Sequence, residues 1–203
     1  MTTPAEEIYS EDYFNYLHNR SSVRKAVRTV YLNDIKKYCI GKTIDFGCGV
    51  GELLKILPEG SVGFEVNKVV VEFCKKNGLN VHLYNPAEDE YNFRMIEPGI
   101  YETFTMNHVL EHLQQSSNVI TKIFESCHRL GIIRIVFTVP GHKGYKSDAT
   151  HETFINMNYL KKTGIGENKY YQLKVNKYFP VNSESFSKVF THNELRLVFD
   201  KRK

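Results

Sequence analysis

The sequence lacks the features that mark secreted, membrane-spanning and disulfide-stapled proteins. Its four cysteines, Cys39, Cys48, Cys74 and Cys127, lie far apart and form no CxxC pair, which argues against a zinc knuckle or disulfide framework and fits a reducing compartment. The acidic opening segment MTTPAEEIYSEDYF has no apolar signal-peptide core. No stretch approaches the roughly 18 apolar residues that span a bilayer. We therefore expect a cytoplasmic protein with no membrane partner.

An excess of charge of one sign is also missing. The formal net charge is +4, and basic residues are interspersed with acidic ones apart from small clusters at Lys36-Lys37 and at residues 201–203. A dedicated nucleic-acid binder usually carries a denser basic stripe, so the composition disfavours nucleic acid as the partner. The length of 203 residues suits one α/β domain, and we find no internal repeat.

Apolar runs and helical patterns alternate through the chain. The pattern predicts strands at 43–46, 61–66, 80–84, 102–106 and 132–139, and helices at 52–57, 69–77 and 119–130. Such alternation predicts a parallel sheet, and two further strands at 170–179 and 194–199 predict an antiparallel pair. We expect a doubly wound, Rossmann-like α/β fold with a seven-stranded sheet, mostly parallel with an antiparallel last strand. One domain would span 1–203, with a helical segment at 1–40 and a core at 41–203.

A glycine-rich loop, DFGCGVG at 45–51, follows the first predicted strand. Glycines there allow a tight turn and close approach of a ligand, and the N-terminus of the predicted helix adds unpaired N–H groups. The dinucleotide fingerprint GxGxxG would place its third glycine at position 52, which is Glu52; here the third glycine is Gly51. This spacing disfavours a nicotinamide oxidoreductase.

An acidic residue, Glu65, ends the second predicted strand, 20 residues beyond Asp45 (65 − 45). A carboxylate at that place can accept hydrogen bonds from both hydroxyls of a ribose. The loop and the acid together predict a nucleoside site at the ends of the first two strands.

These motifs resemble those of the class I S-adenosylmethionine-dependent methyltransferases, from about residue 44 to residue 199. YNPAEDE resembles the segment that edges the adenine, TFTMNHVLEHL the fourth strand and the helix after it, and CHRLGIIRIVFTVPG the passage into the fifth strand. Many relatives have Asp where this chain has Pro86. The resemblance implies S-adenosylmethionine as cofactor, contacted by Asp45, Gly47, Cys48, Gly49, Gly51, Glu65, Val66, Asn85, Ala87, Glu88, Asn107 and His108.

The N-terminal segment around Tyr13 resembles the aromatic lid of methyltransferases from sugar and small-metabolite pathways. The resemblance implies that Tyr13, with Tyr9 and Phe14, covers the cofactor. It also implies that an arginine pairs with the cofactor carboxylate; the candidates are Arg20, Arg24 and Arg28, of which we name Arg24. Ordinary burial of the aromatic rings is the alternative.

The segment NHVLEH at 107–112 resembles one in the quinone-biosynthesis O-methyltransferases, where acids and a histidine hold a divalent metal. Glu111 and His112 match that pattern, but His108 stands where relatives have a first Glu, so the match to a metal site is incomplete. Local pairing of Glu111 and packing of His112 are the alternatives. The segment also spells the zinc-peptidase signature HxxEH, which its place after a buried strand disfavours.

The polar loop at 141–151 is the second part of the predicted acceptor site. It is long for a connection between strand and helix, which suits contact with a substrate. His151 precedes an aromatic residue as in similar relatives, and histidine is the commonest general base for a hydroxyl. We predict His151 as the base, with His112 and His108 as the other candidates; a structural role at the next helix is the alternative.

The sequence therefore predicts an S-adenosylmethionine-dependent methyltransferase that acts on an oxygen of a small metabolite or sugar. The alternatives are an RNA or protein methyltransferase and a non-catalytic, cofactor-binding regulator.

Overall fold

A computed structural model describes residues 22–203, with side chains from residue 27 onward. The predicted lid residues Tyr9, Tyr13 and Phe14, together with Arg20 and the side chain of Arg24, lie outside this described part.

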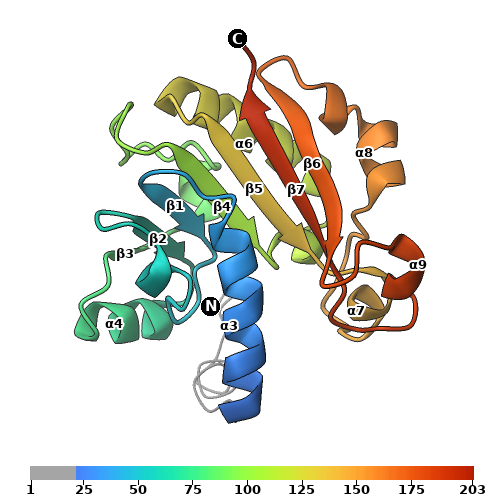
Figure 1. The fold of residues 1–203 in the computed structure, drawn as a ribbon. Coiled ribbons are helices and arrows are strands. Elements are labelled where there is room, and N and C mark those ends of the chain that lie inside the picture. The colour runs from blue at the N-terminus through green and yellow to red at the C-terminus, as the bar shows by residue number, and fades with distance from the viewer. Residues whose placement is uncertain (1–21) are drawn as a thin grey trace.

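One sheet of seven strands runs through the described part, in the order β3-β2-β1-β4-β5-β7-β6 (Figure 1). Strands β1 to β5 pair in parallel, and β7 runs antiparallel to both of its neighbours, β5 and β6. The predicted Rossmann-like sheet with an antiparallel last strand is thus confirmed. The strands are β1 (Thr43–Phe46), β2 (Val62–Glu65), β3 (Val81–Leu83), β4 (Thr103–Asn107), β5 (Arg134–Val139), β6 (Tyr171–Phe179) and β7 (Glu194–Lys201).

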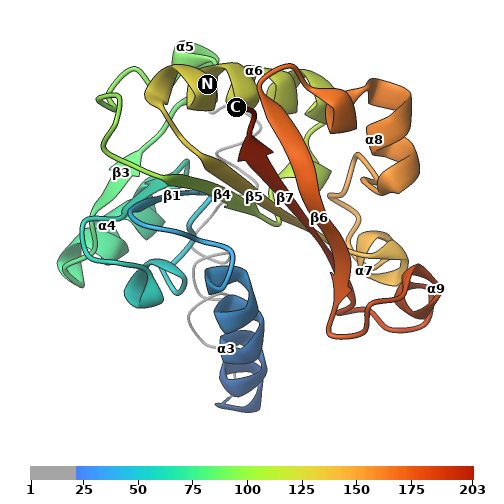
Figure 2. The same cartoon turned by 45° about the horizontal axis from the view of Figure 1, so that its top comes forward.

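Helices cover both faces of the sheet. Figure 2 shows α3 and α4 on one face and α5 and α6 on the other. The helices are α3 (Ser22–Lys36), α4 (Lys68–Lys76), α5 (Pro86–Asp89), α6 (Ser116–Leu130), α7 (His142–Lys146), α8 (Met157–Thr163) and α9 (Glu184–Ser187), with 3-10 turns η1 (Leu54–Ile56), η2 (Leu110–His112) and η3 (Ile165–Glu167). In the described part, none of them has both the length and the apolar character needed to cross a bilayer.

The two faces of the sheet differ in chemistry because successive strand residues point to opposite sides. Ile44 and Phe46 of β1 join the large apolar core with α6. Asp45, between them, belongs to the opposite side, where Leu32 and Ile35 of α3 pack in a smaller apolar cluster. The first strand therefore directs an acidic side chain toward the layer that contains α3.

Two local predictions were wrong. The predicted helix at 52–57 is only the three-residue turn η1. Gly51 has a φ of +73°, and Leu57 is extended (ψ 162°) before Pro58, which disfavours helical backbone in the residue ahead of it. No full helix dipole therefore faces the glycine loop. The predicted loop at 141–151 contains the helix α7, and the helix α8 that follows was not predicted.

Candidate active site

The glycine loop is tied to the neighbouring strand by its backbone. Gly47 and Cys48 donate their N–H groups to the carbonyl of Phe64, at 2.8 and 3.2 Å. Gly47 has a φ of +71°, and a Cβ there would lie 2.4 Å from Cγ2 of Val109. Only glycine fits at this turn. The loop is therefore a fixed backbone cradle at the end of β1.

Glu65 holds that cradle together. Its Oε2 accepts from the N–H of Gly49 at 2.9 Å, and its Oε1 accepts from Val66 and Asn67 at 2.8 and 3.0 Å. Burial raises the pKa of Glu65, while these three donors oppose the rise. A carboxylate has about four acceptor positions, so one is left for an incoming hydroxyl. If both ribose hydroxyls bind to Glu65, one hydroxyl must share an acceptor position with a backbone N–H.

Asp45 is buried at the start of the same loop. Burial raises the pKa of Asp45 to about 7, against the opposing effects of Arg28 on α3 and of the Asn107 amide. Arg28 also forms an ion pair with Glu52. The structure thus brings Asp45 and Asn107 together on the side of the sheet that α3 covers.

The predicted adenine segment lies beside Glu65. The N–H of Tyr84 donates to the carbonyl of Glu65 at 2.9 Å, which fixes this segment next to β2. Asn85 caps α5, because its Oδ1 accepts from the N–H of Ala87 at 3.0 Å. The side-chain oxygen of Asn85 and the backbone N–H of Ala87 are therefore already engaged. Val66 is 37% exposed and Glu88 is also exposed. An apolar side chain and a carboxylate are therefore open to a ligand here.

Two buried oxygens near the tip of β4 have no hydrogen-bond partner among the described residues. They are Oδ1 of Asn107 and Oγ1 of Thr138, whose residues are paired across β4 and β5. An unpaired buried acceptor costs about 1–3 kcal/mol, so such groups are normally paired with a donor from the protein, water or a ligand. These two oxygens, at the strand ends next to the glycine loop, form a polar surface that we call the polar floor.

His108 is held between two carboxylates. Its Nδ1 lies 3.2 Å from Oε1 of Glu111, and its Nε2 lies 3.1 Å from Oε1 of Glu194. Burial would lower the pKa of His108, but the two carboxylates raise it to about 10, and despite burial the same contact helps to lower the pKa of Glu194 to about 2. An imidazolium with both nitrogens engaged is poorly suited to accept a proton, which argues against His108 as the base.

The ionic contacts continue into the protein. Nη1 of the fully buried Arg196 donates to Oε2 of Glu194 at 2.7 Å, and its Nε lies 3.4 Å from Oδ2 of Asp34 on α3. Glu194 and Arg196 were not among the site residues predicted from the sequence. Their signal was two charged residues on one face of an otherwise apolar strand, which predicts either an exposed face or a buried ionic contact.

A candidate metal site lies beyond the carboxyl ends of the parallel strands, where Glu111, His112 and His151 come together. One ligand atom from each lies within 4.8 Å of the others, and Oε2 of Glu111 is buried without a partner in the described structure. The His112 and His151 rings are 4.8 Å apart. Because His108 has a φ of +55° and η2 is only three residues long, His108 and His112 do not share a helix face as a zinc peptidase would require.

The two lysines of α7 differ in their surroundings. Lys143 donates to the carbonyl of Val189 at 2.9 Å and is therefore engaged with the backbone, whereas Lys146 is exposed at the end of α7.

The sequence model of a family described as "Methyltransferase domain" matches residues 14–199. The chain belongs to this family. Membership confirms the prediction of a methyltransferase that uses S-adenosylmethionine, because the match covers the glycine loop, Glu65 and the strands that carry them. No curated protein sequence matches the chain.

Solved methyltransferases share the fold at low sequence identity. A SAM-dependent methyltransferase from Archaeoglobus fulgidus has a TM-score of 0.63 at 18% identity, over 95% of this chain and 99% of that one. Magnesium protoporphyrin IX methyltransferase from Synechocystis PCC 6803, with bound SAH, has 0.65 at 13%, over 98% of each. Geranyl diphosphate C-methyltransferase from Streptomyces coelicolor A3(2) has 0.59 at 11%, over 87% and 77%. Their acceptors differ, so the fold does not set the acceptor.

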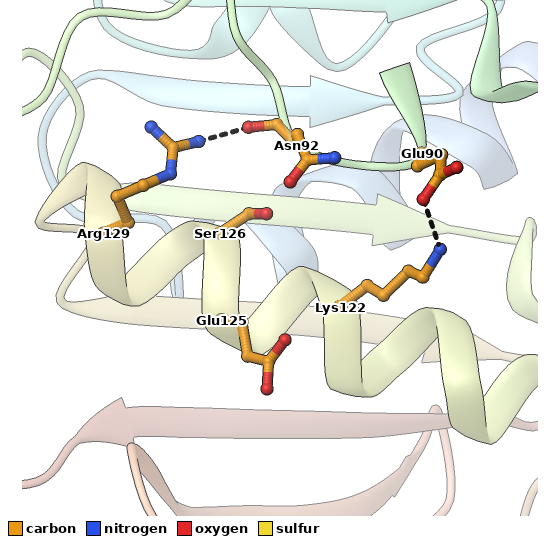
Figure 3. Close-up of a pocket in the computed structure, with 6 residues that line it drawn as sticks. All are labelled: Glu90, Asn92, Lys122, Glu125, Ser126 and Arg129. Carbon is orange, nitrogen blue, oxygen red and sulfur yellow. Dashed lines mark hydrogen bonds and ion pairs between the residues drawn. The ribbon is translucent and has the colours of Figure 1, made fainter. Parts of the chain in front are cut away.

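A pocket on the surface of this methyltransferase lies between α6 and residues 90–92 (Figure 3). Its two outer cations are already engaged: Nζ of Lys122 is 3.1 Å from Oε2 of Glu90, and Arg129 donates to the carbonyl of Asn92. None of the predicted site residues lines it. Both cations of the pocket are therefore already engaged, and the pocket is separate from the predicted site.

Proposed function

We propose that this methyltransferase transfers the methyl group of S-adenosylmethionine to an oxygen atom of a small metabolite or sugar. The observation that carries the proposal is the convergence of His112, His151 and the unpaired oxygen of Glu111 at the edge of the sheet, close to the tip of β4. When bound, the cofactor supplies a methyl group on a sulfonium, which is already activated for displacement. The protein then has to orient the acceptor and receive its proton.

The cofactor would be held by the backbone cradle and its neighbours. The Gly47–Gly51 loop offers close approach, and Glu65 retains one acceptor position for a ribose hydroxyl. The unpaired oxygens of Asn107 and Thr138 fit the amino group of the methionine part, because an ammonium brings three donors and no acceptor. Val66 and Glu88 would border the adenine.

His151 is the residue we propose as general base. Its Nδ1 lies 2.8 Å from the carbonyl of Tyr145, which accepts hydrogen bonds but cannot donate, so the proton of the neutral ring belongs on Nδ1. Nε2 then carries the lone pair that takes the proton of an acceptor hydroxyl. His112, 4.8 Å away between ring centres, lines the same space.

The same three side chains also have the donors of a metal site. One carboxylate and two imidazoles suit a divalent transition metal better than Mg²⁺, which prefers oxygen ligands. An ion there would be held by Glu111, His112 and His151 and would lower the pKa of an acceptor hydroxyl bound to it.

An acceptor screen tests this proposal. The purified chain, with S-adenosylmethionine, is offered monosaccharides, nucleotide sugars, catechols and short RNA oligonucleotides, and S-adenosylhomocysteine release is measured with and without EDTA. Turnover on a hydroxylated small molecule that survives EDTA supports the base mechanism, and turnover restored only by a transition metal supports the ion. Methylation of RNA alone, falling steeply with salt, contradicts the small-molecule acceptor. Cofactor binding without any turnover would favour the regulator.

A further inference from the structure

A carboxylate and a hydroxyl stand behind the two histidines. Oγ1 of Thr150 donates to Oδ1 of Asp148 at 2.7 Å, and the N–H of Thr150 donates to the same oxygen at 2.9 Å. On its other side, Oγ1 of Thr150 lies 3.0 Å from Nδ1 of His112. The turn after α7 therefore contacts Nδ1 of His112 through the hydroxyl group of Thr150.

Proton counting assigns the tautomer of His112. A threonine hydroxyl has one proton, and the charged carboxylate is its stronger acceptor, so Oγ1 must accept from His112 rather than donate to it. The carbonyl of Thr150, 3.3 Å from the same Nδ1, is also only an acceptor. Both neighbours require a proton on Nδ1. The lone pair of the neutral ring therefore sits on Nε2.

The same carboxylate also faces the second histidine. Oδ2 of Asp148 is 3.9 Å from Nε2 of His151, while Nδ1 of that ring is fixed by the carbonyl of Tyr145. The Tyr145 ring stacks on His151 at 5.6 Å and 18° and restricts its rotation. Although burial opposes the shift, the hydrogen bonds from Thr150 lower the pKa of Asp148, which keeps it charged.

We propose that Asp148 and Thr150 are positioning residues of the acceptor site, which fix His112 in the Nδ1–H tautomer and hold a carboxylate beside Nε2 of His151. Both histidines then offer an Nε2 lone pair to the same space, whether to a hydroxyl proton or to an ion. The naming of this space as the acceptor site rests on the proposed function; the tautomer does not. No other element in the described part supplies a polar contact to Nδ1 of His112.

The direct test is the tautomer itself. In ¹⁵N-labelled full-length protein, long-range ¹H–¹⁵N spectra distinguish Nδ1–H from Nε2–H imidazoles, and assignment uses His112→Gln and His151→Gln. We expect both rings as Nδ1–H in the wild type. Thr150→Val removes the hydroxyl at nearly constant shape and leaves only the longer contact, 3.3 Å, from Nδ1 to the carbonyl of residue 150. We therefore expect the Nε2–H tautomer of His112 to become populated beside the Nδ1–H form.

Activity gives the second readout. Loss of an outer partner of a functional histidine typically costs about 10- to 100-fold. We expect Thr150→Val to lower kcat by about that factor with the KM for S-adenosylmethionine unchanged, and Thr150→Ser to restore it. Thr163→Val is the matched control, because Thr163 is exposed and its hydroxyl contacts only carbonyls of its own helix, those of Tyr159 and Leu160.

The two ways of failing are distinguishable. A wild-type spectrum with His112 as Nε2–H, or a Thr150→Val protein with unchanged tautomer and unchanged kcat, overturns the positioning role. Correct tautomers in a protein that methylates no acceptor leave the positioning intact and overturn the proposed function instead.

Discussion

The three histidines near the end of β4 have different surroundings, and these set what each can do. His108 is an imidazolium between Glu111 and Glu194. His112 and His151 each have one nitrogen bonded to loop oxygens and one nitrogen that has no hydrogen-bond partner among the described residues. Proton acceptance therefore falls to the latter two. The order of preference that the sequence suggested, with His151 first, is supported by this geometry and stays a prediction.

Replacing His151 by alanine tests its role as base. We expect His151→Ala to leave cofactor affinity unchanged and to slow turnover by about 100-fold, because positioned general bases contribute 10²–10⁴-fold. Turnover is measured as S-adenosylhomocysteine release with the acceptor found in the screen. His128→Ala is the matched control, since His128 stacks on Tyr170 far along α6. Equal turnover of His151→Ala and wild type would return His151 to a structural role.

The motifs of the proposed cofactor side are easier to read from the sequence than the contacts of the proposed acceptor side. The glycine loop and Glu65 are recognisable because each is a local motif at a strand end. Thr150 and Arg196 were missed because their meaning depends on partners far along the chain: Thr150 meets His112, 38 residues away, and Arg196 meets Asp34 across the sheet. No local pattern encodes such a contact.

At the level of elements, β7 matters through its buried charges. Glu194 and Arg196 on this strand connect His108, at the end of β4, with Asp34 on α3. A buried ionic group costs desolvation, which is offset only when its partners are in place. This connection therefore ties the orientation of α3 to the acceptor site.

Removing Arg196 should be severe. We expect Arg196→Met to lower the free energy of unfolding by up to about 3–5 kcal/mol, because it removes the fully buried cation between Asp34 and Glu194. Among the described residues, Asp34 then keeps only Lys37 as an ion-pair partner, at 3.6 Å, and Glu194 only His108, at 3.1 Å. Urea denaturation measures the change. Arg94→Met, which removes the exposed cation 3.9 Å from Asp89, should cost only about 0–1 kcal/mol. Similar losses in both variants would show that the buried contacts carry no special weight.

Strands were predicted more closely than helices. Thr43–Phe46 was predicted as observed, because a short apolar strand that ends in glycines has few alternatives. Helix α6 begins at Ser116, three residues before the prediction, since its hydroxyl donates to the carbonyls of Leu110 and Leu113, a contact that periodicity does not reveal. Helix α8 was readable in principle from Asn156, which caps it, and Gly164, which ends it.

At the scale of the whole molecule, ionisation should shape stability. His108 has its pKa raised from 6.5 to about 10, so its contribution is complete below pH 6.5 and is lost as pH rises through 10. Glu194, lowered from 4.5 to about 2, contributes fully above pH 4.5 and loses this as pH falls through 2. Burial raises the pKa of Asp45 from 3.8 to about 7, so its contribution is complete below pH 3.8 and is lost as the pH rises to 7. Above pH 7 the four cysteine thiols, whose pKa values burial raises, also contribute, but equally in the wild type and in a His108 variant. The difference between the two proteins therefore reports His108.

We expect the free energy of unfolding to fall between pH 7 and pH 9 in the wild type, and to fall less in His108→Asn. Asparagine tolerates the left-handed backbone at this position, so the variant changes the charge with little strain. Urea denaturation at each pH, with EDTA present, measures the slopes. Identical slopes in the two proteins would mean that Glu111 and Glu194 do not hold the proton on His108.

The backbone cradle, the polar floor and the two histidines, His112 and His151, all lie where the parallel strands end. Open α/β sheets bind their ligands at this place. Calorimetric titration with S-adenosylhomocysteine tests this most directly. The account predicts saturable one-to-one binding, weakened in Glu65→Ala by about 1–3 kcal/mol and unaltered in Glu72→Ala, an exposed acid on α4. Absence of binding by the folded wild type, or equal affinity of the Glu65→Ala protein, would contradict it.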